Sequence, residues 1–194
     1  MMASRSPRMR WIAAVSAMIL GLGMAIATAP ERADAYALLG CKWNTYAIRY
    51  HAPAPLLSHT AWTTAASSWN SAITSGPTLS NNASDPHIHA LNENRGNTVA
   101  WTGVTRKRGT VQTPPTCSTS GVWQRGQMDV VLNWSLQTSY GYTTAQRRMV
   151  AAHEFGHAFG LAHYNSLTSA DVPKALMYAY DNKRIEHKVY SPKN

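Results

Sequence analysis

Residues 153–163 read His-Glu-Phe-Gly-His-Ala-Phe-Gly-Leu-Ala-His, a run that sets three imidazoles and one carboxylate at fixed spacing. On a helix, His153 and His157 project from one face on adjacent turns, so their ring nitrogens can bind one metal ion together. Gly160 can adopt the left-handed conformation that ends a helix and turns the chain back. His163 can then approach the same ion from a third direction. The pattern predicts a three-histidine zinc site with one position left for water.

The carboxylate inside this run favours a catalytic zinc over a structural one. Glu154 follows the first histidine, where it is suited to take a proton from the zinc-bound water. Structural zinc sites usually close the fourth position with another Cys or His and have no use for a glutamate at this point. We therefore expect a catalytic site that holds one zinc ion.

The motif is similar to that of the metzincin metalloproteases, which carry a methionine turn beneath the metal. Residues 175–178 read Ala-Leu-Met-Tyr and follow the third histidine after a short loop, so the resemblance implies that Met177 forms this Met-turn. Within the metzincins, residues 172–178 resemble the matrixins, which have a closely similar Val-Pro-x-Ala-Leu-Met-Tyr stretch. Residues 42–50 also resemble the opening strand of a matrixin catalytic domain. The resemblance implies a zinc endopeptidase with Glu154 as general base.

Several residues depart from the matrixin pattern. Tyr164 follows the third histidine, where matrixins typically have Ser and astacins Glu. The whole chain has nine Asp and Glu residues, and we find no acidic loop of the kind that holds calcium, so we predict no calcium site. Asp85, His87 and His89 are a partial echo of the matrixin structural zinc site. His87 and His89 would share one face of a strand, and such a pair is more often a solvated strand face than a pair of metal ligands.

The rest of the pattern predicts an α/β (α+β) fold with a twisted mixed sheet, an active-site helix, the Met-turn and a short C-terminal helix. Strands are expected at 45–50, 86–91, 98–104 and 128–134. A first helix is expected between a Ser58 cap and Gly76. The active-site helix is expected to start near Thr143 with Gln146 as its capping-box partner, and a last helix could lie at 182–190.

The resemblance also implies how a protein or peptide substrate lies. In metzincins the substrate runs extended along the outer strand of the sheet, which here would be 98–102, with Val99, Ala100 and Trp101 in contact. The pocket beside the zinc would be formed near Pro173, Met177, Tyr178 and Tyr180. Apolar walls of this kind hold an aliphatic or aromatic side chain better than a charge, so cleavage is expected before apolar residues.

Residues 1–35 are predicted to be a secretory signal peptide, which leaves 36–194 as the matrixin-like catalytic domain. A basic start is followed by an apolar stretch at 11–29 and a small-x-small site at 33–35, directly before Tyr36. Cleavage after Ala29, retention as a membrane anchor, and a lipoprotein box at 38–41 are the alternatives. The favoured reading is a secreted, extracellular protein without a membrane segment once the signal is removed.

The chain has two cysteines, and export to an oxidising compartment favours a disulfide between Cys41 and Cys117. The alternative is that Cys41 blocks the zinc, as a cysteine of the matrixin propeptide does. The residues around Cys41 lack the Arg-Cys-Gly setting of such a switch, so the disulfide is the better hypothesis.

The formal net charge is +9, with Arg106, Lys107 and Arg108 clustered together. Without an aromatic-interleaved basic stripe or a nucleic-acid motif, this basicity is expected to be a solvated surface, so no nucleic-acid partner is predicted. We expect a monomer. Two other functions stay open from the sequence: a zinc-stabilised binding or adhesion protein without turnover, and a metal hydrolase of non-peptide substrates.

Overall fold

The computed structural model describes residues 38–54, 58–164 and 176–180. The chain divides into Met1–Asp34 and Ala35–Asn194, and every described residue lies in the second unit. The predicted signal peptide, the pocket residue Pro173 and the helix expected at 182–190 lie outside the described residues.

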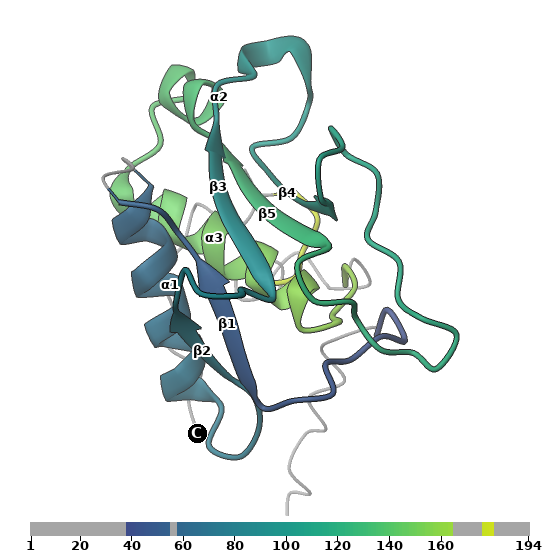
Figure 1. The fold of residues 1–194 in the computed structure, drawn as a ribbon. Coiled ribbons are helices and arrows are strands. Elements are labelled where there is room, and N and C mark those ends of the chain that lie inside the picture. Colours follow the sequence, from purple (N-terminus) through teal and green to yellow (C-terminus); the bar gives the residue numbers. More distant parts are fainter. Residues whose placement is uncertain (1–37, 55–57, 165–175, 181–194) are drawn as a thin grey trace, which may run out of the picture. The chain divides into compact units, whose positions relative to one another are not determined.

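A five-stranded mixed sheet forms the centre of the fold, in the order β2-β1-β3-β5-β4. The strands are β1 (Ala47–His51), β2 (Thr78–Asn81), β3 (Ile88–Glu93), β4 (Gly103–Lys107) and β5 (Met128–Asn133). The pairs β1–β2, β1–β3 and β3–β5 are parallel, whereas β4 runs antiparallel to β5 at the end of the sheet (Figure 1). The predicted mixed α/β fold is confirmed.

The helices are α1 (His59–Ala72), α2 (Trp134–Ser139) and α3 (Thr144–Ala158), with a short 3-10 helix, η1 (Gly96–Thr98). In Figure 1, α3 runs behind the sheet and α1 stands at the left, next to β1 and β2. Phe155 of α3 is fully buried, and its ring makes edge-on contacts with Tyr50 of β1 and Trp62 of α1. These rings join the two helices to the sheet, so α3 has a fixed position under the strands.

The start of α3 follows its sequence signal. The Thr143 side chain accepts a hydrogen bond from Gln146 N, and the Gln146 side chain accepts one from Thr143 N, which confirms the predicted capping box. The first helix begins after Ser58 as expected, although the Ser58 side chain makes no capping hydrogen bond and the helix ends at Ala72. Within the described residues, no helix has the length and apolarity needed to cross a membrane.

The strand expected at 98–104 was wrong in its bounds, because the edge strand is Gly103–Lys107. The side chain of Asn133 donates to the carbonyls of Gly96 and Trp101, which holds this stretch in a loop instead of a ladder. The same residue caps α2 by accepting from Leu136 N, so β5 ends at Asn133 and Trp134 begins a helix. Val99, Ala100 and Trp101 therefore precede the edge strand and are not part of it.

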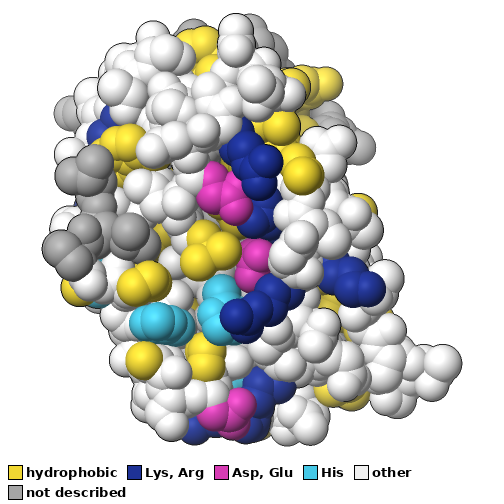
Figure 2. All heavy atoms as spheres, turned by 45° about the horizontal axis from the view of Figure 1, so that its top comes forward, with side chains coloured by type: hydrophobic (Ala, Val, Ile, Leu, Met, Phe, Trp, Pro, Cys, Tyr) yellow, Lys and Arg dark blue, Asp and Glu magenta, His cyan; other side chains and the backbone are white. Residues whose placement is uncertain are grey.

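A network of charged side chains fixes the edge strand to its neighbours. Arg106 of β4 is 3% exposed and pairs with Glu93 of β3 and Asp129 of β5. Arg95 also donates to Glu93, at 2.7 Å. Acidic and basic side chains alternate along the surface shown in Figure 2. Arg106, the first residue of the basic cluster at 106–108, is therefore a buried ion-pair partner and not part of a solvated basic surface.

Burial works against the ionised form of Glu93, but hydrogen bonds and charges from Arg106 and Arg95 outweigh it and lower the pKa of Glu93. The carboxylate is consequently ionised at neutral pH, and the network around β4 depends on that charge.

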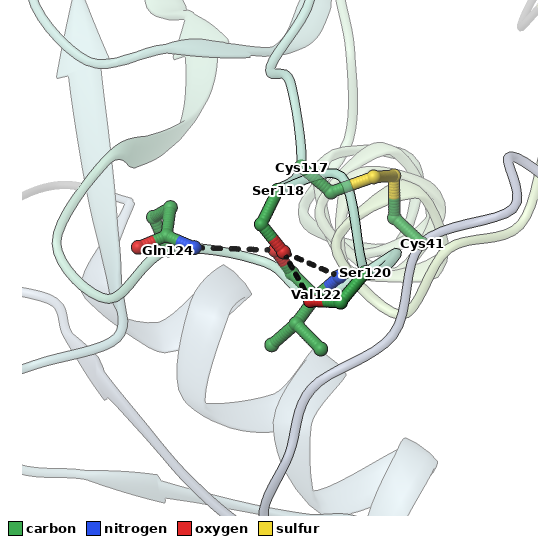
Figure 3. The surroundings of a disulfide bond; sticks show 6 residues. All are labelled: Cys41, Cys117, Ser118, Ser120, Val122 and Gln124. Carbon is green, nitrogen blue, oxygen red and sulfur yellow. Dashed lines mark hydrogen bonds between the residues drawn. A yellow bond between two sulfur atoms is a disulfide. The ribbon is translucent and has the colours of Figure 1, made fainter.

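The disulfide between Cys41 and Cys117 is present, as predicted, and joins the segment before β1 to the loop between β4 and β5 (Figure 3). Because the Cys41 sulfur is bonded to Cys117, it is not a zinc-blocking thiol. The segment around Cys41 packs on the end of α3: Leu39 N donates to Gly160 O at 2.7 Å, and Trp43 Nε1 donates to Ala158 O at 2.9 Å. The disulfide therefore anchors the chain segment that packs on the C-terminal end of α3.

Candidate metal centre and active site

The three histidines of the motif meet at one point. His153 and His157 lie on α3, and their Nε2 atoms are 3.0 Å apart. The Nε2 atom of His163, which follows the helix, lies 3.2 Å from that of His153 and 3.0 Å from that of His157. Within the described ranges, no other group of three His, Cys, Asp or Glu side chains brings its ligand atoms as close together.

Hydrogen bonds at the other ring nitrogens fix the tautomers of two of these histidines. His153 Nδ1 lies 2.7 Å from Leu176 O, and His157 Nδ1 lies 2.7 Å from Leu161 O. A carbonyl oxygen only accepts, so each Nδ1 carries a hydrogen, and in the neutral ring Nε2 then presents a lone pair. Two lone pairs at 3.0 Å repel one another unless a cation lies between them.

The donor set fits zinc. Three nitrogens bound to one zinc at about 2.0–2.1 Å in a tetrahedron lie roughly 3.3 Å apart, close to the spacing of these atoms. Backbone carbonyls that accept from the second ring nitrogen are the usual outer partners of zinc-binding histidines. His153 is buried, His157 is half-buried and His163 is exposed, so the centre is open to solvent on one side. A catalytic zinc needs such an open side, because its fourth ligand is a water molecule that exchanges with substrate.

Glycine at position 160 allows the turn that brings His163 to the centre. Its φ is +97°, in the left-handed region that favours glycine, as the sequence predicted. A Cβ built on Gly160 would lie 2.2 Å from the carbonyl oxygen of Cys41. The position therefore excludes other residues both by backbone conformation and by contact with the disulfide-linked segment.

Met177, which the resemblance implies forms a Met-turn, packs against α3. It is fully buried, and a Cβ built on Gly156 would lie 2.3 Å from its sulfur. The preceding residue, Leu176, supplies the carbonyl that orients His153. Residues 176 and 177 therefore contact α3 through one hydrogen bond and through packing.

Glu154 is adjacent to the first ligand and is 3% exposed. Thr105 of β4 donates from its hydroxyl, which lies 2.8 Å from Glu154 Oε2 and 2.9 Å from Glu154 O. Sequence reasoning found Glu154 but missed Thr105, because a threonine in a strand is ordinary and gives no signal of a site.

Comparison with known proteins gives the family. The matrixin family profile matches residues 58–192, which include the three histidines, Glu154 and Met177. The chain belongs to the matrixin family. Its members are zinc-dependent endopeptidases, which implies a zinc metalloprotease domain, and the three-histidine group is the candidate metal centre of that domain. A search of curated proteins found no match to the chain.

The partial echo of the matrixin structural zinc site has a different arrangement here. His87 is buried, not solvated, and its Nδ1 accepts from Arg49 N at 3.1 Å. Asp85 pairs with Arg49 and Arg125, and His89 contacts Arg108. In this matrixin, Asp85, His87 and His89 therefore each contact an arginine residue.

Burial and nearby arginines lower the pKa of both histidines: Arg125 and Arg49 act on His87, and Arg108 acts on His89. Both imidazoles are consequently neutral at neutral pH.

The predicted substrate residues occupy two regions. Val99 and Trp101 are half-buried and Ala100 is exposed in the loop before β4. Tyr178 and Tyr180 follow Met177, with ring centroids 5.9 Å apart, and Tyr180 is 63% exposed. The two tyrosines therefore lie close in sequence to Leu176, whose carbonyl contacts His153.

Proposed function

We propose that this matrixin is a secreted zinc endopeptidase in which Glu154 is the general base. The observation that carries the proposal is the convergence of three Nε2 atoms next to a buried carboxylate, with one side of the centre exposed. His153, His157 and His163 would hold the metal. Bound there, zinc polarises the scissile carbonyl and makes a water molecule more acidic.

The side chains of the chain perform the remaining steps. Glu154 accepts the proton of the attacking water and delivers it to the amine of the leaving peptide. The carbonyls of Leu176 and Leu161 keep His153 and His157 in the tautomer that presents Nε2 to the metal. Burial of Glu154 protects the carboxylate from bulk water, so its orientation is set by the protein.

The substrate lies along the edge strand in this proposal. Among the described strands, β2 and β4 are the two edges of the sheet, and β4 is the one that contacts α3, so its outer edge offers backbone groups to an extended peptide beside the site. Contacts from Glu154 to Thr105 connect this strand to the site. Val99, Ala100 and Trp101 would bind the part of the peptide that extends past the strand's start.

The side chain after the cut would enter an apolar pocket formed by Pro173, Tyr178 and Tyr180, beside Met177. We expect cleavage before Leu, Ile, Phe, Met or Tyr and rarely before Asp, Glu or Lys, because an unpaired charge would lose its water there without compensation. Digestion of a protein mixture by the purified chain, followed by mass spectrometry of the new termini, tests this. A clear preference for charged residues after the cut would show that the pocket is misplaced.

A further inference from the structure

Glu154 contacts β4 through both of its carboxylate oxygens. The Thr105 hydroxyl lies 2.8 Å from Oε2, and it also lies 2.9 Å from the main-chain oxygen of the same residue. A hydroxyl that bridges the side chain and main chain of one residue restricts the direction of that side chain relative to its helix. The hydrogen bond is charge-assisted when it goes to the carboxylate, which makes it one of the stronger kinds.

The second contact is with Gly103, two residues earlier on the same face of β4. A Cβ built on Gly103 would lie 2.7 Å from Glu154 Oε1 and 2.4 Å from a methyl carbon of Val150. The φ of Gly103 is not in the left-handed region, so the backbone conformation does not demand glycine here. Glycine is required here because the Glu154 carboxylate and Val150 fill the volume that a side chain would occupy.

The strand that makes these two contacts is itself held in place. In the antiparallel register, Gly103 pairs with Leu132 and Thr105 with Val130 of β5. Arg106, the residue after Thr105, lies on the opposite face of the strand and pairs with Glu93 and Asp129. The strand is therefore a rigid support for the carboxylate.

We propose that Thr105 and Gly103 are positioning residues for Glu154: the hydroxyl of Thr105 fixes one carboxylate oxygen, and the missing side chain of Gly103 leaves room for the other. This inference rests on the proposed role of Glu154 as the general base. A base misplaced by about 1 Å can reduce turnover by roughly 100-fold. The positioning effect acts on the chemical step and leaves the three zinc ligands untouched.

The test replaces Thr105 by Val, which keeps the shape and removes the hydroxyl, and by Ser, which keeps the hydroxyl. Thr105→Val should lower kcat about 10- to 100-fold with KM changed less than about twofold, because the general base is misplaced while substrate contacts remain. Thr105→Ser should stay within about threefold of the parent kcat. Zinc content should be unchanged in both variants, and the thermal unfolding midpoint of zinc-loaded Thr105→Val should fall by only a few degrees, because one hydrogen bond to a buried carboxylate is lost.

Two matched variants complete the design. Thr110→Val removes a hydroxyl that donates to Lys107 O in the loop after β4, and it should leave kcat unchanged. Gly103→Ala should lower kcat with zinc still bound, because the new methyl group displaces the carboxylate. A parent-like kcat for Thr105→Val, or equal losses for the Val and Ser variants, would overturn the inference.

A double-variant comparison separates this inference from the proposed function. With Glu154→Gln as background, Thr105→Val should reduce kcat no further, because the base on which it acts is gone. Full activity of Glu154→Gln alone would refute the proposed role of Glu154. An inactive Glu154→Gln together with an unimpaired Thr105→Val would refute the positioning inference by itself.

Discussion

Removal of the disulfide should cost a large part of the stability of this domain. The bond joins residues separated by 76 positions, and the loop it closes contains β1, α1, β2, β3 and β4. On the chain-entropy estimate, closing a loop of this length stabilises the folded state by about 4.5 kcal/mol at 25 °C. Small domains have a total stability of roughly 5–15 kcal/mol, so the loss would be a substantial share.

The Cys41→Ala/Cys117→Ala double variant tests this value without leaving a free thiol. Denaturant unfolding of the zinc-loaded protein should give a free energy of unfolding lower by about 3–5 kcal/mol, and the thermal midpoint should fall by roughly 10–15 °C. The parent protein treated with a thiol reductant under the same conditions is the control and should lose a similar amount.

The same variant should also bind zinc more weakly. The segment that contains Cys41 contacts Gly160 and Ala158 at the end of α3, and Gly160 turns the chain toward His163. Zinc competition with a chelator should therefore show a lower affinity in the double variant. A loss of unfolding free energy below about 1 kcal/mol would refute the reasoning from loop closure.

Three further perturbations have defined outcomes. Gly160→Ala should reduce zinc content and lower the thermal midpoint, because alanine meets both a φ of +97° and the Cys41 carbonyl, and metal analysis with thermal unfolding will measure both. His163→Ala should lose zinc and proteolysis together, since the two ligands on α3 hold the ion less firmly than three; zinc retained at the parent level would contradict this. The lowered pKa of Glu93 adds stability above the ordinary carboxyl pKa of about 4.3, and this contribution is lost as pH falls toward the folded pKa. Glu93→Gln should therefore be less stable at neutral pH, with a smaller loss of stability on acidification; an unchanged pH dependence would show that Glu93 is not the group responsible.

The metal centre could be predicted from sequence because it is local. The spacing of His153, His157 and Gly160 specifies a helix face and a turn, and both are set by backbone geometry over a few residues. The capping box of α3 was predictable for the same reason. The disulfide followed from the number of cysteines and the expected compartment.

The edge strand could not be placed from sequence because its position depends on a distant side chain. Residues 98–102 have the composition of a strand, but the Asn133 side chain donates to the carbonyl of Gly96, before this stretch, and to that of Trp101, within it, and keeps the stretch in a loop. The contacts of Glu154 with Thr105 and Gly103 depend on the same placement of β4. Short β2, with one buried residue, gave too little periodicity to be recognised.

The central claim is that this matrixin hydrolyses peptide bonds with Glu154 as the base and zinc on three histidines. The most direct measurement compares the purified parent chain with Glu154→Ala, each assayed for bound zinc and for cleavage of a protein mixture with and without a chelator. The account predicts that both proteins bind zinc, that the parent alone produces new termini, and that the chelator abolishes them. Zinc loss or near-parent turnover in Glu154→Ala, or cleavage by the parent that persists without metal, would contradict it.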